Sequence, residues 1–411
     1  MSDFLDALET RDPGQREAAL MAALTMQVEH AQVSSPAYTE LLAGVDAAAI
    51  TSRAALATLP LTRKSSLSAA QAARRALRLG GYAAGMPRRI FQSPGPLYEP
   101  EPDADGGDPW RVARALHAAG VRAGQLAHVS FSYHLTPAGA MMEAGLRALG
   151  AASFPGGVGN TELQLQALLD LQPEAYAGTP SFLRILLEKA AEGGHALPYL
   201  QRALVSGEAC PPALVAWFAE RGVDAYQCYA TADLGLIAYQ TAAREGLVVD
   251  EGVIVEIVRP GTGDPLPDGE VGEVVVTTLS PGYPLIRFAT GDLSAVMPGP
   301  SPCGRSNQRL RGWLGRADQS AKVRGMFVHA GQVAEVLLRC GQRGRARLVV
   351  DGELANDRMC LRLEAEDRPE GLAERLQVAL RDITKLRGEV ELCAPGSLPN
   401  DGRVIEDRRP V

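Results

Sequence analysis

Between Trp110 and Ala230 the sequence alternates between strand-like and helix-like segments, and this alternation constrains the fold more than any other feature. Short apolar runs are followed by stretches with apolar residues at helical spacing, and Gly120 and Gly150 close two of these stretches. Alternating strands and helices of this kind are typical of a parallel sheet covered by helices. The segments expected to form its strands are 126–133, 151–157, 175–178, 202–207 and 224–230.

The segments before this region predict helices and a long connection. From Pro13 to about Ala43 apolar residues recur at helical spacing, which predicts one long helix. Residues 90–109 are rich in proline and acidic residues and lack periodicity. They are expected to form a long surface loop or hairpin, a type of segment that often carries function.

Beyond Leu236 strand-like segments predominate, and Asp268-Gly269 between two apolar runs indicates a hairpin. The last segments alternate helix and strand again in a short α+β pattern. We therefore predict an α/β fold with two domains. The large N-terminal domain (residues 1–315) would hold parallel sheet layers and a β-rich subdomain from about residue 237. A small α+β domain (residues 316–411) would follow.

Charge and cysteine usage exclude several classes of protein. The 41 basic and 48 acidic residues give a net charge of −7, which argues against nucleic-acid or anionic-membrane binding. Six cysteines lie far apart with no CxxC pair, as expected for reduced thiols in a cytoplasmic protein. No signal peptide is expected, and no apolar run is long enough to span a membrane.

Polar or glycine-containing clusters follow three of the expected strands. They are Ser206-Gly207-Glu208, the segment from Tyr229 to Asp233, and Thr290-Gly291-Asp292, which we expect at the end of a strand. Each cluster alone is more often an ordinary turn than a site. In an open parallel sheet, however, ligands bind beyond the carboxyl ends of the strands, so the three together predict one binding site.

Several short motifs in a fixed order resemble the adenylate-forming enzymes, which include acyl-CoA synthetases, luciferases and adenylation domains. The pattern is most similar to the phenylacetate-CoA ligase branch. Each motif is weak by itself, but together they run over most of the chain. They are LPLTRK (59–64), GGVGNTELQ (156–164), TPS (179–181), PCGR (302–305), GRAD (315–318), KVRG (322–325) and GSLP (396–399).

The resemblance implies that a carboxylate attacks the α-phosphate of Mg-ATP and that coenzyme A then displaces AMP from the acyl-adenylate. ATP, Mg²⁺ and CoA would be the cofactors, and a small carboxylic acid the substrate. A homodimer is among the assemblies that the resemblance allows. The nucleotide-binding residues that it implies are Ser206, Gly207, Glu208, Tyr229, Asp233, Asp292 and Arg316.

Some of these residues would have distinct roles. Tyr229 would stack on the adenine. Asp292 would accept hydrogen bonds from both ribose hydroxyls. Asp233 would bind Mg²⁺ in place of the family's glutamate.

The same resemblance implies further roles outside the nucleotide pocket. Asp318 would be the hinge that makes the small domain mobile between the two half-reactions. Gly325 would border the CoA tunnel, where a side chain would obstruct the thiol. The acyl pocket would lie near Phe131, Tyr133 and His134, although a buried strand end explains these residues about equally well.

The chain departs from the family at the groups that handle phosphate. The aligned phosphate loop, residues 92–100, has prolines that remove N–H donors, no lysine and no threonine. The acidic residues of the 90–109 segment would repel a triphosphate unless a metal intervenes; they are Glu99, Glu101, Asp103, Asp105 and Asp108. Near the C-terminus the resemblance implies a catalytic lysine. Either Arg403 replaces it and keeps the charge with a different shape, or Arg403 matches a later basic residue and the lysine is absent. We predict no zinc, because Cys303 has no partners with ligand spacing.

Three functions therefore remain open. The first is an AMP-forming acyl- or aryl-CoA ligase with a divergent phosphate loop. The second is a non-catalytic nucleotide- or acyl-CoA-binding protein on the same fold. The third is an adenylating enzyme that donates the acyl group to a carrier protein or an amine.

Overall fold

A mixed sheet in the order β14-β15-β10-β9-β8-β7-β6-β4-β5 organises the first part of the chain in this computed structural model. The structure describes residues 3–102, 107–317, 320–324, 326–352, 357–400 and 403–409. By its contacts the chain divides into two units, residues 1–315 and 316–411. None of the helices in the described part of the chain is long and apolar enough to cross a membrane.

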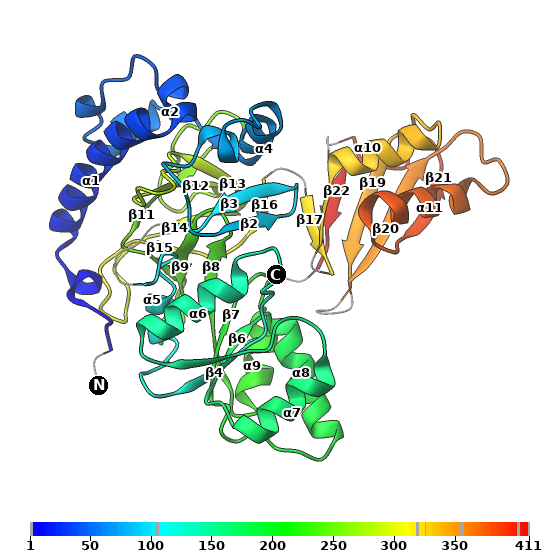
Figure 1. Ribbon diagram of the computed structural model, residues 1–411. Coiled ribbons are helices and arrows are strands. Elements are labelled where there is room, and N and C mark those ends of the chain that lie inside the picture. Colours follow the sequence, from blue (N-terminus) through cyan, green and yellow to red (C-terminus); the bar gives the residue numbers. More distant parts are fainter. Residues whose placement is uncertain are drawn as a thin grey trace. The chain divides into compact units, whose positions relative to one another are not determined.

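The parallel half of this sheet matches the predicted alternation. Its strands are β4 (Leu126–Val129), β5 (Ala152–Pro155), β6 (Ala175–Gly178), β7 (Arg202–Val205) and β8 (Asp224–Thr231). The helices around it are α5 (Ala113–Ala118), α6 (Ala138–Ala148), α7 (Thr161–Leu171), α8 (Pro180–Glu192) and α9 (Pro212–Ala219). Figure 1 shows α5 and α6 on one side of these strands and α7 and α8 on the other. Each crossover between parallel strands is expected to be right-handed. The chain adds β5 on one side of β4 and then β6 on the other, so the later helices cover the opposite face.

The β-rich part continues the sheet with antiparallel strands and adds a second sheet. The added strands of the first sheet are β9 (Gly235–Tyr239), β10 (Leu247–Val249), β14 (Val296–Met297) and β15 (Arg309–Leu310). The second sheet follows the order β1 (Thr62–Arg63), β13 (Phe288–Ser294), β12 (Gly272–Thr278) and β11 (Val253–Val258). The predicted α/β class with parallel layers and a β-rich part is confirmed.

The predicted long N-terminal helix is wrong in one respect, because two helices replace it. They are α1 (Pro13–Ser34) and α2 (Pro36–Leu41). Ser35 between them is extended, since the residue before a proline avoids helical geometry. Its hydroxyl caps α2 by accepting from the Tyr38 N–H. Leu24 and Val28 of α1 pack with the second sheet in one core.

Two short helices and a hairpin follow α2 and border the second sheet. They are α3 (Arg53–Ala57), α4 (Lys64–Ala73) and the hairpin β2–β3, whose strands are Ile90–Ser93 and Leu97–Pro100. Residues 94–96 form the tip of the hairpin. Of these three residues only Gly95 carries a backbone N–H, because the other two are prolines.

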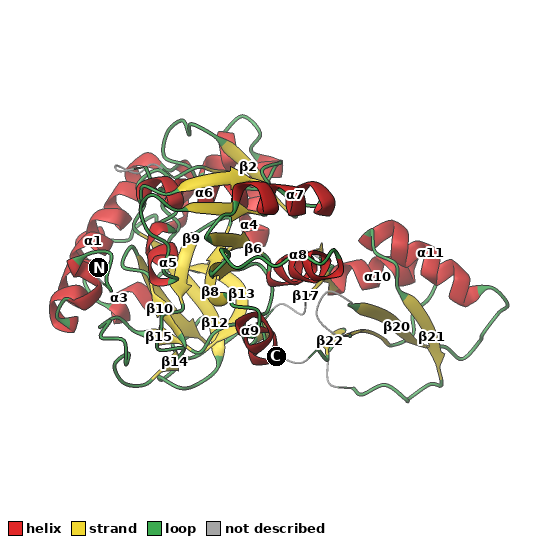
Figure 2. Cartoon of the chain, turned by 90° about the horizontal axis from the view of Figure 1, so that it is seen from below, coloured by secondary structure: helices red, strands yellow, loops and turns green. Residues whose placement is uncertain are grey.

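The second unit has its own apolar core between one sheet and two helices (Figure 2). Its sheet follows the order β21 (Glu389–Cys393), β20 (Arg358–Glu364), β19 (Ala346–Asp351) and β22 (Ile405–Asp407). The helices are α10 (Ala330–Arg339) and α11 (Leu372–Thr384), and a hairpin pairs β17 (Ser320–Val323) with β18 (Met326–His329).

Candidate active site

Two of the predicted polar clusters lie at the carboxyl ends of neighbouring parallel strands: Ser206-Gly207-Glu208 follows β7, whereas the cluster from Tyr229 to Asp233 begins inside β8, which runs to Thr231. The carboxyl ends of the two strands meet at the same edge of the sheet. The Ser206 hydroxyl donates a 2.8 Å hydrogen bond to the Cys228 carbonyl, which ties the turn after β7 to β8. Gly207 has a φ of +81°, a backbone conformation that favours glycine. Glu208 beside it is half-buried.

The third cluster is not at a strand end, which corrects the prediction for Thr290, Gly291 and Asp292. These residues lie inside β13. Gly291 has a φ of +75°, and the pairing of β12 with β13 shifts register beside it. The irregularity is consistent with a bulge, which redirects side chains while the strand continues.

Asp292 nevertheless meets Tyr229, as the site prediction requires. The Tyr229 hydroxyl donates a 2.8 Å hydrogen bond to Asp292 Oδ2. Asp292 is 8% exposed. Each carboxylate oxygen has two lone pairs, so Asp292 keeps acceptor capacity for further hydroxyl groups.

Trp313 joins this pair and was missed by the sequence analysis. Its indole Nε1–H donates a 3.0 Å hydrogen bond to Asp292 Oδ1. The indole therefore holds the second oxygen of the carboxylate while 36% of the residue stays exposed. The segment before Gly315 resembled a polar connection, and its single tryptophan was the one available signal.

Asp233 follows β8 and meets Lys64 at the start of α4. The Lys64 ammonium donates to Asp233 Oδ2 at 3.2 Å and lies 3.7 Å from Glu99 Oε1. Glu99 comes from β3, is 1% exposed and accepts a 2.6 Å hydrogen bond from the Ser93 hydroxyl. Burial, and then the charge of Asp233, raise the pKa of Glu99 to about 9. Glu99, Asp233 and Lys64 are referred to below as the carboxyl–lysine cluster.

The acidic residues after β2 do not act as one repelling surface. Glu101 pairs with Arg89, whose Nη2 lies 2.6 Å from its Oε1. The Asp108 carboxylate accepts from the Ala113 N–H at the start of α5. Asp103 and Asp105 lie outside the described residues. Glu99 is thus the acid from this stretch that the structure brings to Asp233.

The carboxyl–lysine cluster fits a divalent cation. Glu99 Oε2 and Asp233 Oδ1 are both buried, and apart from a hydrogen bond between the two carboxyl groups themselves they have no partner among the described residues. Carboxylate oxygens are the protein ligands that Mg²⁺ prefers, usually one or two of them with water and phosphate oxygens. No group of three His, Cys, Asp or Glu residues in the described part could hold a metal ion. Any further ligands at this cluster would therefore come from water or a bound phosphate.

The expected acyl-pocket residues follow β4 and separate into two groups. Phe131 is buried and Tyr133 is half-buried. The Tyr133 ring packs on Gly139 of α6 so closely that a Cβ added there would lie 2.7 Å from the ring. The Tyr133 hydroxyl is buried without a described hydrogen-bond partner, and burial raises its pKa. His134 is exposed. The structure thus places Phe131 and Tyr133 in one apolar region but not His134.

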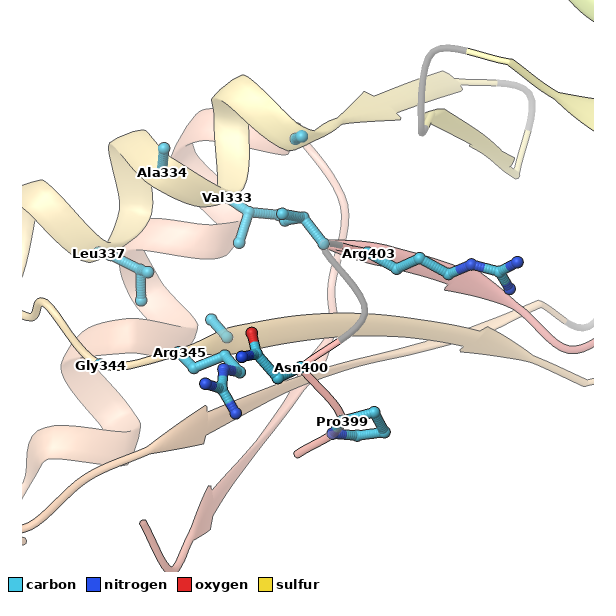
Figure 3. A pocket seen from close by; sticks show the side chains of 11 residues that line it. Val333, Ala334, Leu337, Gly344, Arg345, Pro399, Asn400 and Arg403 are labelled. Atoms are coloured by element: carbon cyan, nitrogen blue, oxygen red, sulfur yellow. The ribbon is translucent and has the colours of Figure 1, made fainter. Parts of the chain in front are cut away.

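Arg403 lines a pocket of about 310 Å³ inside the second unit. Figure 3 shows its side chain extending away from Val333, Leu337 and Arg345 of the same pocket. Arg316 is the first residue of that unit and ends strand β16 (Gly315–Arg316). The predicted hinge residue Asp318 and tunnel residue Gly325 lie outside the described residues.

Cys303, for which no zinc was predicted, contacts polar side chains. Its sulfur lies 3.1 Å from the Ser301 hydroxyl, and an Arg305 N–H donates to it at 3.7 Å. Burial acts to raise the pKa of Cys303, but hydrogen bonds from Ser301, Thr241 and Arg305 outweigh it and lower the pKa. Polar groups of Ser301, Thr241 and Arg305 therefore surround this thiol.

Comparisons with known proteins agree with this arrangement. Residues 138–283 match the family described as "AMP-binding enzyme". A phenylacetate-coenzyme A ligase of Aromatoleum evansii is 28% identical over 99% of this chain and 97% of its own length. One from Thermus thermophilus is 31% identical over 70% of this chain and 71% of its own length. The crystal structure of a 2-hydroxyisobutyryl-CoA ligase with 2-HIB-AMP and CoA matches with a TM-score of 0.82 and 25% identity. It covers 99% of this chain and 93% of the ligase.

The match extends over the region that holds Ser206, Tyr229 and Asp233, and the Aromatoleum evansii ligase aligns along nearly the whole chain. At 31% identity over 71% of a relative's length, common descent is the explanation. The chain belongs to the phenylacetate-CoA ligase branch of the adenylate-forming enzymes.

Proposed function

We propose that this protein is an AMP-forming acid–thiol ligase that converts a small carboxylic acid into its coenzyme A thioester. The acid would attack the α-phosphate of ATP and release pyrophosphate. The thiol of CoA would then attack the acyl carbon and expel AMP. The relatives' names point to an aromatic acid or a small branched acid as the substrate class.

The observation that carries the proposal is the buried Asp292 carboxylate, held between the Tyr229 hydroxyl and the Trp313 indole. A carboxylate held by two neutral donors keeps its charge and both oxygens in one orientation. That arrangement suits two adjacent ribose hydroxyls. The turn at Ser206 and Gly207 brings backbone to the edge where an adenine would lie against Tyr229.

The remaining roles complete the proposal. Asp233 would hold Mg²⁺, which when bound offsets the charge of the phosphates. Arg316 would contact the ribose or phosphates, and Arg403 would stabilise charge on the α-phosphate. Asp318 would act as hinge and Gly325 would border the CoA tunnel. We also propose that the protein is cytoplasmic, in keeping with its six free cysteines. A homodimer is the assembly that we propose for it.

A second candidate function is supported by the β2–β3 hairpin. Its tip is Pro94-Gly95-Pro96, and its inner face presents Glu99 where the family has a phosphate-cradling loop. A protein that binds AMP or acyl-CoA without catalysis would not need that loop. An enzyme that donates the acyl group to a carrier protein or an amine would share the first half-reaction.

ATP–pyrophosphate exchange with a panel of aromatic and short branched acids tests the proposal. We expect exchange that depends on one class of acid. Coenzyme A consumption with the same acid would then assign the acceptor. If no acid supports exchange while AMP still binds by calorimetry, the ligase function is wrong and the binding protein is favoured.

A further inference from the structure

The carboxyl–lysine cluster brings together three chain segments that are distant in sequence. Lys64 begins α4, Glu99 lies on β3, and Asp233 follows β8. Both carboxyl side chains are at least nine-tenths buried, with Glu99 1% and Asp233 5% exposed. The Lys64 side chain is 42% exposed. The cluster therefore consists of two buried carboxyl groups and one partly exposed lysine that contacts both.

The hydrogen bonds of the cluster leave specific atoms unused. Glu99 Oε1 accepts from Ser93, and Asp233 Oδ2 accepts from Lys64. Apart from a hydrogen bond between the two carboxyl groups themselves, Glu99 Oε2 and Asp233 Oδ1 have no hydrogen-bond partner among the described residues. Buried polar atoms without partners are rare in folded proteins because they lose their contacts with water.

Tyr283 adds an independent observation. It is 2% exposed, and its hydroxyl is buried without a hydrogen-bond partner in the described part of the chain. The charges of Asp233 and Glu99 act on this hydroxyl and, after burial, help to raise its pKa. The Tyr283 hydroxyl therefore lies within range of the charges of both carboxyl groups, and its unmade hydrogen bond suits a water or phosphate oxygen on a bound ion.

We propose that Glu99 is a second carboxylate ligand, with Asp233, for a divalent cation that carries the nucleotide's phosphates. In this chain the hairpin would hold the phosphates through the metal instead of cradling them with backbone N–H groups. Glu99 Oε2 and Asp233 Oδ1 would be the ligating atoms, and Tyr283 would bind a water or phosphate oxygen on the ion. This inference rests on the proposed function only for the identity of the phosphate ligand.

Lys64 occupies the cluster as an internal cation and would have to leave when a metal binds. Its ammonium is 3.2 Å from Asp233 Oδ2 and 3.7 Å from Glu99 Oε1, so its positive charge opposes a second cation nearby. A half-exposed lysine on a four-carbon stem can move its charge into water. Removing this charge is therefore expected to tighten metal binding, whereas removing either carboxylate weakens it.

Binding of Mn²⁺ alone, followed by electron paramagnetic resonance with no nucleotide or acid, tests the inference. We expect Glu99→Gln and Asp233→Asn each to weaken Mn²⁺ binding by about tenfold or more. Gln at 99 keeps a hydrogen-bond donor for Asp233 and removes only the ligand charge. Glu101→Gln, on the same segment but paired with Arg89, is the matched control and should stay within about twofold of the parent.

Lys64→Met provides a second variant that leaves both carboxylates in place. It should bind Mn²⁺ several-fold more tightly than the parent. The inference is overturned if Glu99→Gln binds as the parent does, if Lys64→Met leaves the affinity unchanged, or if the parent binds no Mn²⁺ at millimolar concentration. Because the assay uses no acid, ATP or CoA, a failed ligase assay with retained Mn²⁺ binding would refute the proposed function alone.

Discussion

The Tyr229 hydroxyl donates a 2.8 Å hydrogen bond to Oδ2 of Asp292, a residue 63 positions later in the chain. The bond joins strand β8 of the first sheet to strand β13 of the second sheet. It fixes the aromatic ring and the carboxylate relative to each other. An adenine and a ribose could then be recognised by one rigid unit rather than by two independent side chains.

Changes to this pair should affect nucleotide affinity in a graded way. Asp292→Ala removes the charged acceptor for two hydroxyls and should weaken AMP binding by about 100-fold. Tyr229→Phe keeps the ring and removes one hydrogen bond, so a loss of about fivefold is expected. Tyr226→Phe removes a similar 2.9 Å bond to Asp224 on the same strand and serves as the control. Titration calorimetry with AMP measures all three, and unchanged affinity of Asp292→Ala would contradict the assignment.

The sequence predicted the parallel half of the fold because strands and helices there alternate with clear spacing. It placed Asp292 at a strand end because Thr-Gly-Asp is a common turn. The strand instead continues through Gly291, whose positive φ absorbs the irregularity. The strand continues because β13 pairs with β12, a segment distant from the turn motif. Three residues alone do not encode such long-range pairing.

Glu99 and Trp313 show a second limit of the sequence analysis. Glu99 was expected to repel phosphate, but it shares the inner face of β3 with Leu97 because residues two apart in a strand point the same way. Trp313 lies in a segment without periodicity, so its contact with Asp292 depends on tertiary structure. The partners of both residues come from distant segments.

The buried pair of Arg287 and Glu256 should be essential for stability. The Arg287 Nε–H donates to Glu256 Oε2 at 3.1 Å, and its other nitrogens donate to backbone carbonyls, including that of Leu59 at 2.6 Å. Arg287→Leu leaves Glu256 buried without its cation and should lower the free energy of unfolding by about 3–5 kcal/mol. Urea denaturation measures this loss. Arg259→Leu at an exposed site nearby should change it little, and equal effects would refute the argument.

The Cys303 thiol should react at lower pH than Cys360. Hydrogen bonds from Ser301, Thr241 and Arg305 lower the pKa of Cys303, whereas burial and nearby acids raise the pKa of Cys360. Since the thiolate is the nucleophile, the alkylation curve of Cys303 should lie at lower pH. Peptide mass spectrometry after iodoacetamide labelling gives both curves. Ser301→Ala should move the Cys303 curve to higher pH, and an unshifted curve would count against this hydrogen bond.

Arg403 is proposed to act on the α-phosphate, so its loss should affect the two half-reactions unequally. Arg403→Ala should slow acyl-adenylate formation by about 100-fold and thioester formation far less. Arg345→Ala in the same pocket is the control, because this side chain donates to the Leu398 carbonyl and has no proposed catalytic role. Single-turnover kinetics separate the steps. Equal effects of Arg403→Ala on both would remove it from the mechanism.

The path of the carboxylate oxygen tests the central claim, that the chain activates an acid as its acyl-adenylate. With an ¹⁸O-labelled acid, attack on the α-phosphate places one labelled oxygen between the acyl carbon and phosphorus. Thiol attack on the acyl carbon then leaves that oxygen on AMP. Mass spectrometry of the nucleotide should therefore find AMP carrying one ¹⁸O, with a CoA thioester formed in equal amount. Unlabelled AMP, or formation of ADP instead, would contradict the account.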